Sequence, residues 1–423
     1  MKSKKVVIVG GGFAGLNAAR GLGSRSGVDV TLIDKHNFHL FQPLLYQVAM
    51  AGLSPADIAV PIRSLLARHQ NIKVLQGAVS GFDVESQKVI SDIGDIEYDY
   101  LIIACGAVPS YFGHTEWEEH APSLKTISQA TEIRRRILTA FELAEHTDDR
   151  EKQRSLLTFV VIGGGPTGVE LAGAIGEMSR FTLARDFRNI DARLTRVFLI
   201  EGGPRILPTF SESLSSRATR DLEKLGVQVW LNSFVQHIDD EGVQIGGDRI
   251  SSSTVLWAAG VRGAQLQADD ATESDKLNRI YVEQDLSLPD HKNVFVAGDQ
   301  ASLARSIEGI SIPGTAPAAM QQGRYLAKLI LNDIAGKERS PFIFVDRGQM
   351  ATIGRSRAVV EFGRFKLAGF FAWITWLLVH IYFLVGFKNR LFVVISWAWS
   401  HLTFARGARL IVERDWHSDE PEK

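Results

Sequence analysis

The chain has 423 residues and a formal net charge of -1, with 47 Lys and Arg against 48 Asp and Glu. This length allows two or three domains with large cores, and a nearly neutral chain has no overall basic field, which argues against nucleic acid as a partner. Cys105 is the single cysteine, which excludes internal disulfides and a cysteine-built metal site and fits a location facing the cytosol. The 11 histidines are dispersed without ligand spacing, so no metal site is predicted.

The N-terminal segment predicts a strand, a tight turn and a helix. Residues 6–16 read VVIVGGGFAGL, in which a β-branched apolar run breaks into GxGxxG at Gly10, Gly12 and Gly15. Such glycines let the backbone turn sharply and approach a pyrophosphate, while the helix presents free N–H groups to the anion. The basic start superficially resembles a signal peptide, but the apolar run is short and ends in glycines, so it reads better as a first strand.

The second strand is expected to end in an acidic residue that accepts hydrogen bonds from a ribose 2′-hydroxyl. VDVTLID places Asp34 there, 24 residues after Gly10. The whole pattern recurs at residues 159–171, FVVIGGGPTGVEL, and TRVFLIE places Glu201 at the matching position, 38 residues after Gly163. An insertion around FTLARDFRNIDARL must lengthen this second crossover. Two complete copies of the pattern predict two dinucleotide sites.

Small-residue turns close each nucleotide unit. YDYLIIACG (98–106) and STVLWAAG, which ends at Gly260, each read as a buried strand followed by a turn that lets backbone approach a ligand. HKNVFVAGDQA delivers Asp299 at the carboxyl end of a strand, where open α/β sheets bind ligands. FHLFQPLLYQVA (38–49) has no regular period and is expected to loop over a cofactor.

The order of these segments predicts an α/β fold with two Rossmann-like dinucleotide-binding domains, the second inserted in the first at about residues 112–265, with the chain returning near residue 280. The predicted domains are a first dinucleotide-binding domain, a second dinucleotide-binding domain and a C-terminal region with membrane-anchoring helices. Their residues are 1–111 with 280–335, 112–279, and 336–423.

The C-terminal tail has the composition of a membrane-associating segment. Residues 363–412 hold six Lys or Arg, no Asp or Glu, and four of the eight tryptophans. Residues 367–387 are 21 residues without formal charge, long enough to span a bilayer, whereas 391–404 is too short to return. The scattered tryptophans favour amphipathic helices lying in the interface over a span. A buried helix or a dimer contact stays open, and His380 is expected to be interfacial or packed.

Together these motifs resemble the two-dinucleotide-binding-domain flavoproteins, and more narrowly the type II NADH dehydrogenases, or NADH:quinone oxidoreductases. The resemblance covers nearly the whole chain and includes ATIGRSRAVV and WLLVHIYFLVGFKNR. It implies that the first module holds FAD and the second NADH. It also implies that Glu170 lies beside nicotinamide and flavin, either orienting the nicotinamide or relaying protons. The implied cofactor-binding residues are Gly10, Gly11, Gly12, Phe13, Ala14, Gly15, Asp34, Lys35, Val79, Ala104, Gly106, Asp299 and Ala316 in the first module, and Gly163, Gly165, Gly168, Glu201, Ala259 and Gly260 in the second.

The resemblance also implies a quinone contact through Gln321. The family pattern AQxAxQ reads APAAMQ at residues 316–321, where Pro317 replaces the first glutamine. The equally weighted alternative is a helix start whose alanines pack under the flavin. Relatives that exchange electrons with sulfur need at least two cysteines, so Cys105 is expected to be a packed residue.

The predicted function is that of a non-proton-pumping, FAD-dependent NADH:quinone oxidoreductase of the respiratory chain, in which NADH reduces FAD and FAD reduces a membrane quinone. The predicted location is the inner membrane, peripheral or monotopic on the cytoplasmic side, in contact with the lipid surface; a homodimer stays open. Two alternatives are a flavin-dependent NADH reductase of a soluble electron carrier and a membrane-tethered NADH sensor.

Overall fold

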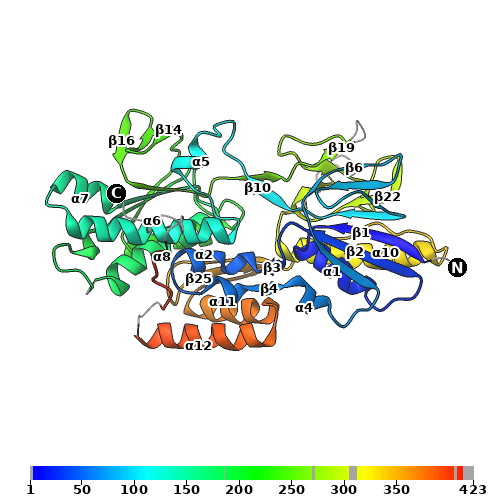
Figure 1. Cartoon of the computed structure of the whole chain (residues 1–423). Helices are drawn as coiled ribbons and strands as arrows, with labels where there is room; N and C mark the ends of the chain where they lie inside the picture. The colour runs from blue at the N-terminus through cyan, green and yellow to red at the C-terminus, as the bar shows by residue number, and fades with distance from the viewer. Residues whose placement is uncertain (1–2, 185, 269–271, 304–311, 404–406, 413–423) are drawn as a thin grey trace, which may run out of the picture. The chain divides into compact units, whose positions relative to one another are not determined.

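The computed structural model of the chain describes residues 3–184, 186–268, 272–303, 312–403 and 407–412 (Figure 1). Contacts between residues divide it into two compact units. Unit 1 comprises Met1–Leu40, Ala59–Pro109 and Val261–Arg347, and unit 2 comprises Phe41–Ile58, Ser110–Gly260 and Gly348–Lys423. The chain therefore crosses between the units five times, and most of unit 2 is inserted into unit 1 in the sequence.

The two units and the predicted domains differ in where some segments belong. Residues 261–279, predicted to lie with the NADH module, group with unit 1, because Val261–Gly263 (β18) pairs antiparallel with Ala107–Pro109 (β10). Residues 41–58 and 348–423 group with unit 2. The two units are defined by contacts between residues and not by the ligands that they bind. The limits of the FAD-binding and NADH-binding domains therefore stay a prediction.

Unit 1 is built on a six-stranded sheet whose order is β21-β22-β9-β1-β2-β5. All neighbours are parallel except β21, which pairs antiparallel with β22. The β-branched run VVIV of β1 is buried on both faces, as expected of a central strand in a parallel sheet. The strands are β1 (Lys4–Val9), β2 (Val28–Asp34), β5 (Ile72–Gln76), β9 (Tyr100–Ile103), β21 (Ser287–Leu288) and β22 (His291–Val296).

Two helices, α1 (Phe13–Leu22) and α10 (Ala316–Ile334), pack side by side in unit 1 (Figure 1). Glycines allow the close approach, because a Cβ on Gly323 would lie 2.1 Å from the carbonyl oxygen of Ala14. The smaller elements of unit 1 are β3 (Phe38–Leu40), β4 (Ala59–Pro61), α4 (Ile62–Leu66), β6 (Val79–Asp83), β7 (Lys88–Ser91), β8 (Ile96–Glu97), β19 (Gln267–Ala268), β20 (Ile280–Tyr281), η4 (Gly298–Gln300) and β23 (Ala301–Ser302).

Unit 2 repeats the plan with a four-stranded parallel sheet in the order β13-β12-β11-β17. An antiparallel sheet, β14-β15-β16, follows β13 in sequence. Helix α6 begins with a capping box between Thr126 and Gln129. The elements are α5 (Trp117–His120), α6 (Ile127–His146), α7 (Arg150–Leu156), β11 (Thr158–Ile162), α8 (Pro166–Glu177), η2 (Met178–Thr182), η3 (Ala192–Leu194), β12 (Arg196–Ile200), α9 (Glu212–Lys224), β13 (Val227–Trp230), β14 (Val235–Asp239), β15 (Gly242–Ile245), β16 (Asp248–Ser251) and β17 (Thr254–Trp257).

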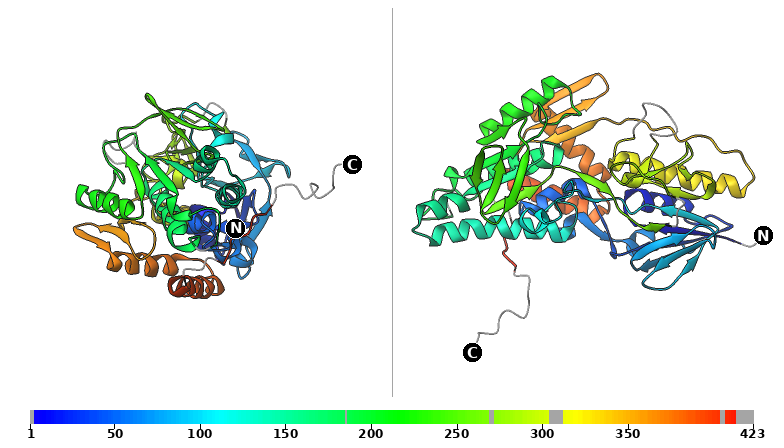
Figure 2. Two further views of the ribbon diagram at one scale, coloured as in Figure 1. Left: turned by 90° about the vertical axis from the view of Figure 1, so that its left-hand side faces the viewer. Right: turned by 90° about the horizontal axis from the view of Figure 1, so that it is seen from above.

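The C-terminal part of unit 2 is a three-stranded antiparallel sheet followed by two helices that lie side by side (Figures 1 and 2). The uncharged run 367–387 is divided, because it begins in a strand that ends at Gly369, with φ +81°, and the helix starts only at Phe370. Within the described ranges, no helix combines the length and apolarity needed to cross a membrane. These elements are β24 (Gln349–Thr352), β25 (Ala358–Phe362), β26 (Phe365–Gly369), α11 (Phe370–Phe383) and α12 (Phe387–Thr403); η1 (Gln42–Leu44), α2 (Leu45–Ala49) and α3 (Pro55–Ile58) also belong to unit 2.

Candidate active site

The first GxGxxG forms the turn between β1 and α1, and each glycine meets a different steric demand. Gly10 has φ +101°, and a Cβ there would lie 2.3 Å from the carbonyl oxygen of Ala104. A Cβ on Gly15 would lie 1.9 Å from the carbonyl oxygen of Gly10. Gly12 faces open space, and no side chain caps the helix that starts after it. The turn therefore leaves uncapped helix N–H groups beside an open space, which suits a pyrophosphate.

Asp34 ends β2 beside this turn. Its Oδ2 accepts a hydrogen bond from the Gly11 N–H at 2.6 Å, and its Oδ1 accepts one from the His36 N–H at 2.7 Å. These bonds hold the carboxylate in place while each oxygen keeps a lone pair for a ribose hydroxyl.

The second GxGxxG repeats this arrangement in unit 2. Gly163 has φ +108°, Gly165 faces open space, and a Cβ on Gly168 would lie 1.8 Å from the carbonyl oxygen of Gly163. Glu201, directly after β12, accepts a hydrogen bond from the N–H of Gly164 at 2.6 Å through Oε2. Its Oε1 accepts one from Gly203 at 2.6 Å. Gly11 and Gly164, each between the first two glycines of its motif, thus hold the acidic residue of their own module.

The other predicted cofactor residues also lie after strands of the two parallel sheets or at a helix start. Ala104 and Gly106 follow β9, Asp299 lies in η4 after β22, and Ala316 is the first residue of α10. Lys35 follows β2, and Val79 begins β6 shortly after β5. In unit 2, Ala259 and Gly260 follow β17. Parallel strands bring their carboxyl ends to one edge of a sheet, so each set gathers at the edge that carries its glycine turn.

Glu170 lies in the second turn of α8 and is the most perturbed carboxyl of unit 2. Although the residue is partly accessible, the protein encloses its carboxyl group, and desolvation raises its pKa to about 8. The Thr352 N–H lies 3.4 Å from Oε1, too far to offset the desolvation. Since the pKa lies above neutrality, the carboxyl group carries a proton at pH 7.

A hydrogen-bonded series of side chains leads away from Thr352. Its hydroxyl lies 2.9 Å from the Tyr46 hydroxyl, which accepts a hydrogen bond from Gln47 Nε2 at 3.0 Å. Trp397 Nε1 donates to Gln47 Oε1 at 2.6 Å. Tyr46, Gln47, Thr352 and Trp397 also line a cavity of unit 2. The series therefore connects the neighbourhood of Glu170 to a cavity at α11 and α12.

Gln321 lies in the second turn of α10, facing backbone of the segment that follows the helix. Its Nε2 donates to the Val345 carbonyl and its Oε1 accepts from the Val345 N–H, both at 3.0 Å. The amide keeps a second N–H for another acceptor. The structure places Gln321 in unit 1 and Glu170 in unit 2.

The side chains of Cys105 and His380 are both packed against apolar neighbours. The Cys105 thiol packs against the core of unit 1, and burial raises its pKa to about 12. His380 stacks on Trp376 with ring centroids 4.1 Å apart, and burial lowers its pKa to about 4. A neutral thiol and a neutral imidazole agree with the packed roles expected for both. Among the described residues, no group of three His, Cys, Asp or Glu side chains could hold a metal ion.

Sequence reasoning missed several polar residues of the site. His39, in β3, is buried, and its Nδ1 lies 2.9 Å from the Gly11 carbonyl oxygen. A carbonyl only accepts, so Nδ1 donates and Nε2 is left as an acceptor; within the described part of the chain, Nε2 has no partner. The irregular segment 38–49 contains both His39 and Tyr46. Its isolated polar residues among apolar ones are the sequence feature that could have indicated these two side chains.

Comparisons with known proteins identify the family. Residues 4–323 match the model of the pyridine nucleotide-disulphide oxidoreductases, and residues 347–406 match that of the NDH2 C-terminal domain. A type II NADH:quinone oxidoreductase of Mycobacterium tuberculosis is 42% identical over 97% of this chain and 90% of its own length. One of Staphylococcus aureus is 31% identical over 85% of this chain and 90% of its own.

Solved structures agree on the fold. The structure of NDH2 from Plasmodium falciparum in complex with NADH has a TM-score of 0.88, with 22% identity over 97% of this chain and 100% of that one. The sulfide:quinone oxidoreductase of Aquifex aeolicus has a TM-score of 0.73, with 23% identity over 92% of each chain. The resemblance seen in the sequence is confirmed: the chain belongs to the type II NADH:quinone oxidoreductases, FAD-dependent enzymes within the pyridine nucleotide-disulphide oxidoreductase family.

Proposed function

We propose that the protein oxidises NADH and reduces a membrane quinone, with FAD held by unit 1 and NADH by unit 2. The observation that carries this proposal is the duplicated module. In both copies a helix begins without a side-chain cap, one glycine faces open space, and a backbone N–H of the glycine turn donates to the acidic residue. When bound, FAD supplies the redox chemistry: it takes a hydride from NADH and passes two electrons to quinone.

The residues of unit 1 fit FAD. Gly10 to Gly15 cradle its pyrophosphate at the start of α1, and Asp34 accepts hydrogen bonds from its adenosine ribose. Asp299, at the carboxyl end of β22, serves the ribityl side. The buried acceptor His39 Nε2 supports this fit, because a ligand hydroxyl or a water molecule would satisfy it.

The residues of unit 2 fit NADH rather than NADPH. Glu201 accepts from a ribose 2′-hydroxyl and repels a 2′-phosphate. Arg205, the nearby cation that could accommodate a phosphate, donates to the carbonyl oxygens of Phe210 and Pro208 at 2.7 and 2.8 Å. Its guanidinium group is thereby held by backbone of its own loop.

We assign Glu170 a proton-transfer role. Its carboxyl group is protonated at pH 7, so it can donate when the quinone takes up charge. Thr352 and Tyr46 present hydroxyl groups that exchange donor and acceptor roles, and both line the cavity through which water can replace the proton. Orientation of the nicotinamide would not need a side chain with a pKa near 8.

Gln321 is the proposed donor to a quinone carbonyl oxygen. Its second amide N–H is left after both contacts with Val345. Pro317, at the first glutamine position of the family pattern, has no donor, so this chain would hold the headgroup with one amide fewer.

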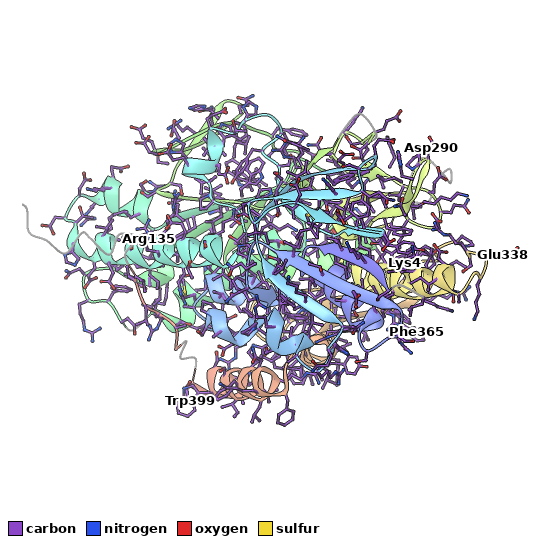
Figure 3. The ribbon with its side chains drawn as sticks, turned by 45° about the vertical axis from the view of Figure 1, so that its right-hand side comes forward. Lys4, Arg135, Asp290, Glu338, Phe365 and Trp399 are labelled. Atoms are coloured by element: carbon purple, nitrogen blue, oxygen red, sulfur yellow. The ribbon has the colours of Figure 1, made fainter. Side chains whose placement is uncertain are left out.

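The tail is the proposed membrane contact, on the cytoplasmic face of the inner membrane. Phe387, Leu391, Ile395 and Trp399 recur at every fourth position of α12, and each is at least half exposed. In Figure 3, Trp399 lies at the outer surface of α12. An exposed apolar stripe of this kind suits a bilayer surface, and Lys388 lies beside it on α12 to contact anionic headgroups.

The decisive experiment is to purify the protein, record its visible spectrum, and follow NADH and NADPH oxidation with a short-chain quinone. A yellow protein that prefers NADH and turns over quinone supports the proposal. A colourless protein, or one bleached by NADH that never recolours with quinone under nitrogen, contradicts it. A flavin that passes electrons only to a ferredoxin would indicate the soluble-carrier alternative, and tight NADH binding without turnover would indicate the sensor.

Membrane attachment has its own test. Deletion of residues 365–423 should release the protein from membranes, as should the double change Phe387→Glu with Ile395→Glu in the full chain. Leu143→Glu, which alters an exposed leucine of α6, is the matched control. Unchanged flotation of the double variant with liposomes would contradict the assigned surface.

A further inference from the structure

An exposed aromatic ring lies next to Glu201 and has no role in the module described so far. Phe234 follows the carboxyl end of β13, the strand next to β12 in the sheet, and 71% of the residue is exposed. Its ring lies against Gly202: a Cβ on Gly202 would come within 2.7 Å of the ring. The side of the ring formed by Cδ1, Cε1 and Cζ therefore lies against backbone that directly follows Glu201, and most of the residue is open to solvent.

The loop that carries Phe234 is tied to the loop that carries Glu201. The Ser233 N–H donates to the Glu201 carbonyl oxygen, and the Asn232 N–H donates to the Gly203 carbonyl oxygen, both at 3.0 Å. Asn232 adopts φ +51°, in the left-handed region. Because the carboxylate and the ring belong to two cross-linked loops, the position of one sets the position of the other.

The geometry of the sheet gives the direction in which a bound dinucleotide would run. The pyrophosphate belongs at the start of α8, after β11, and the small-residue turn at Gly260 follows β17 on one side of β11. Glu201 and Phe234 follow β12 and β13 on the other side. A ribose held by Glu201 would therefore point its base toward the end of β13.

We propose that Phe234 is the platform on which the adenine ring of NADH stacks. The inference rests on the proposed function, since it assumes that the second module takes NADH. A purine presents a flat π-face, and stacking on an aromatic ring removes apolar surface from water on both partners. Gly202 is required for this arrangement, because any side chain there would displace the Phe234 ring from its present position.

The test compares two donors on the flavin-loaded holoenzyme. Phe234→Ala should raise KM for NADH by about 10-fold to 100-fold, the loss expected from one base–aromatic stack, with kcat little changed. Reduced nicotinamide mononucleotide, which lacks adenine, should be oxidised equally by variant and wild type. Calorimetry with ADP-ribose should show the same loss of affinity as NADH, independently of turnover.

Matched variants separate stacking from a general effect of the loop. Phe234→Trp should keep the affinity for ADP-ribose, and Gly202→Ala, which displaces the ring without removing it, should weaken binding by an intermediate factor. Leu194→Ala alters another highly exposed apolar residue, at the amino end of β12, and should change nothing.

Equal ADP-ribose affinity in wild type and Phe234→Ala would overturn the platform, as would a parallel loss of activity with the mononucleotide. A wild-type holoenzyme that oxidises no NADH would instead defeat the proposed function, while the ADP-ribose titration would still decide whether Phe234 contacts the base.

Discussion

Replacement of Glu170 by glutamine should change how the stability of the protein depends on pH. The native carboxyl group has a pKa of about 8, against 4.5 for a free side chain. Between these values the folded state holds a proton that the unfolded state releases, so stability is lost as pH rises from about 4.5 to about 8. About three and a half pKa units at about 1.36 kcal/mol each set an upper value of about 5 kcal/mol.

Because the residue is partly accessible, about 3 kcal/mol is the loss we expect for the wild type. Spread over the unfolding entropy of 423 residues, this corresponds to about 3 °C in Tm. Glutamine does not titrate, so the variant should lack this loss.

The measurement is thermal unfolding of wild type and Glu170→Gln at pH 5 and pH 8.5, with Glu142→Gln as the control for an exposed glutamate. Relative to the variant, the wild type should lose about 3 °C between the two pH values. A wild type and variant whose melting temperatures keep the same difference at both pH values would refute the raised pKa, and with it the proton-transfer role that depends on it.

Three further changes test other parts of the site. Gly10→Ala places a Cβ 2.3 Å from the Ala104 carbonyl oxygen at φ +101°, which costs at least about 2 kcal/mol of strain. This variant should purify without flavin absorbance. The control, Gly247→Ala, places its Cβ in open space and should stay yellow. Glu201→Ser removes the repulsion of a 2′-phosphate, so the ratio of kcat/KM for NADH to that for NADPH should fall at least about 10-fold; an unchanged ratio would mean that another group selects the donor. Tyr46→Phe keeps the ring but removes the hydroxyl from the series, so reoxidation by quinone should slow and reduction by NADH should not, as stopped-flow absorbance would show; equal slowing of both steps would contradict a proton role.

The sequence by itself determined the two nucleotide modules, because their signals are local. A glycine turn, the strand before it and the acid that ends the next strand lie within about 40 residues in each copy, and their backbone demands leave few alternatives to glycine. The same locality made the family recognisable, and it located the closing turns at Gly106 and Gly260.

Tertiary structure alone decided the surroundings of Glu170 and the shape of the tail. Tyr46, Thr352 and Trp397 come from segments about 45 to 350 residues apart, and no spacing rule indicates that their polar atoms meet around one cavity. The uncharged run 367–387 satisfies a length criterion for spanning a bilayer, yet a strand takes its first residues, and the helix begins only after Gly369, with φ +81°. Composition reports how apolar a segment is, whereas pairing with β25 decides how much of it can become helix.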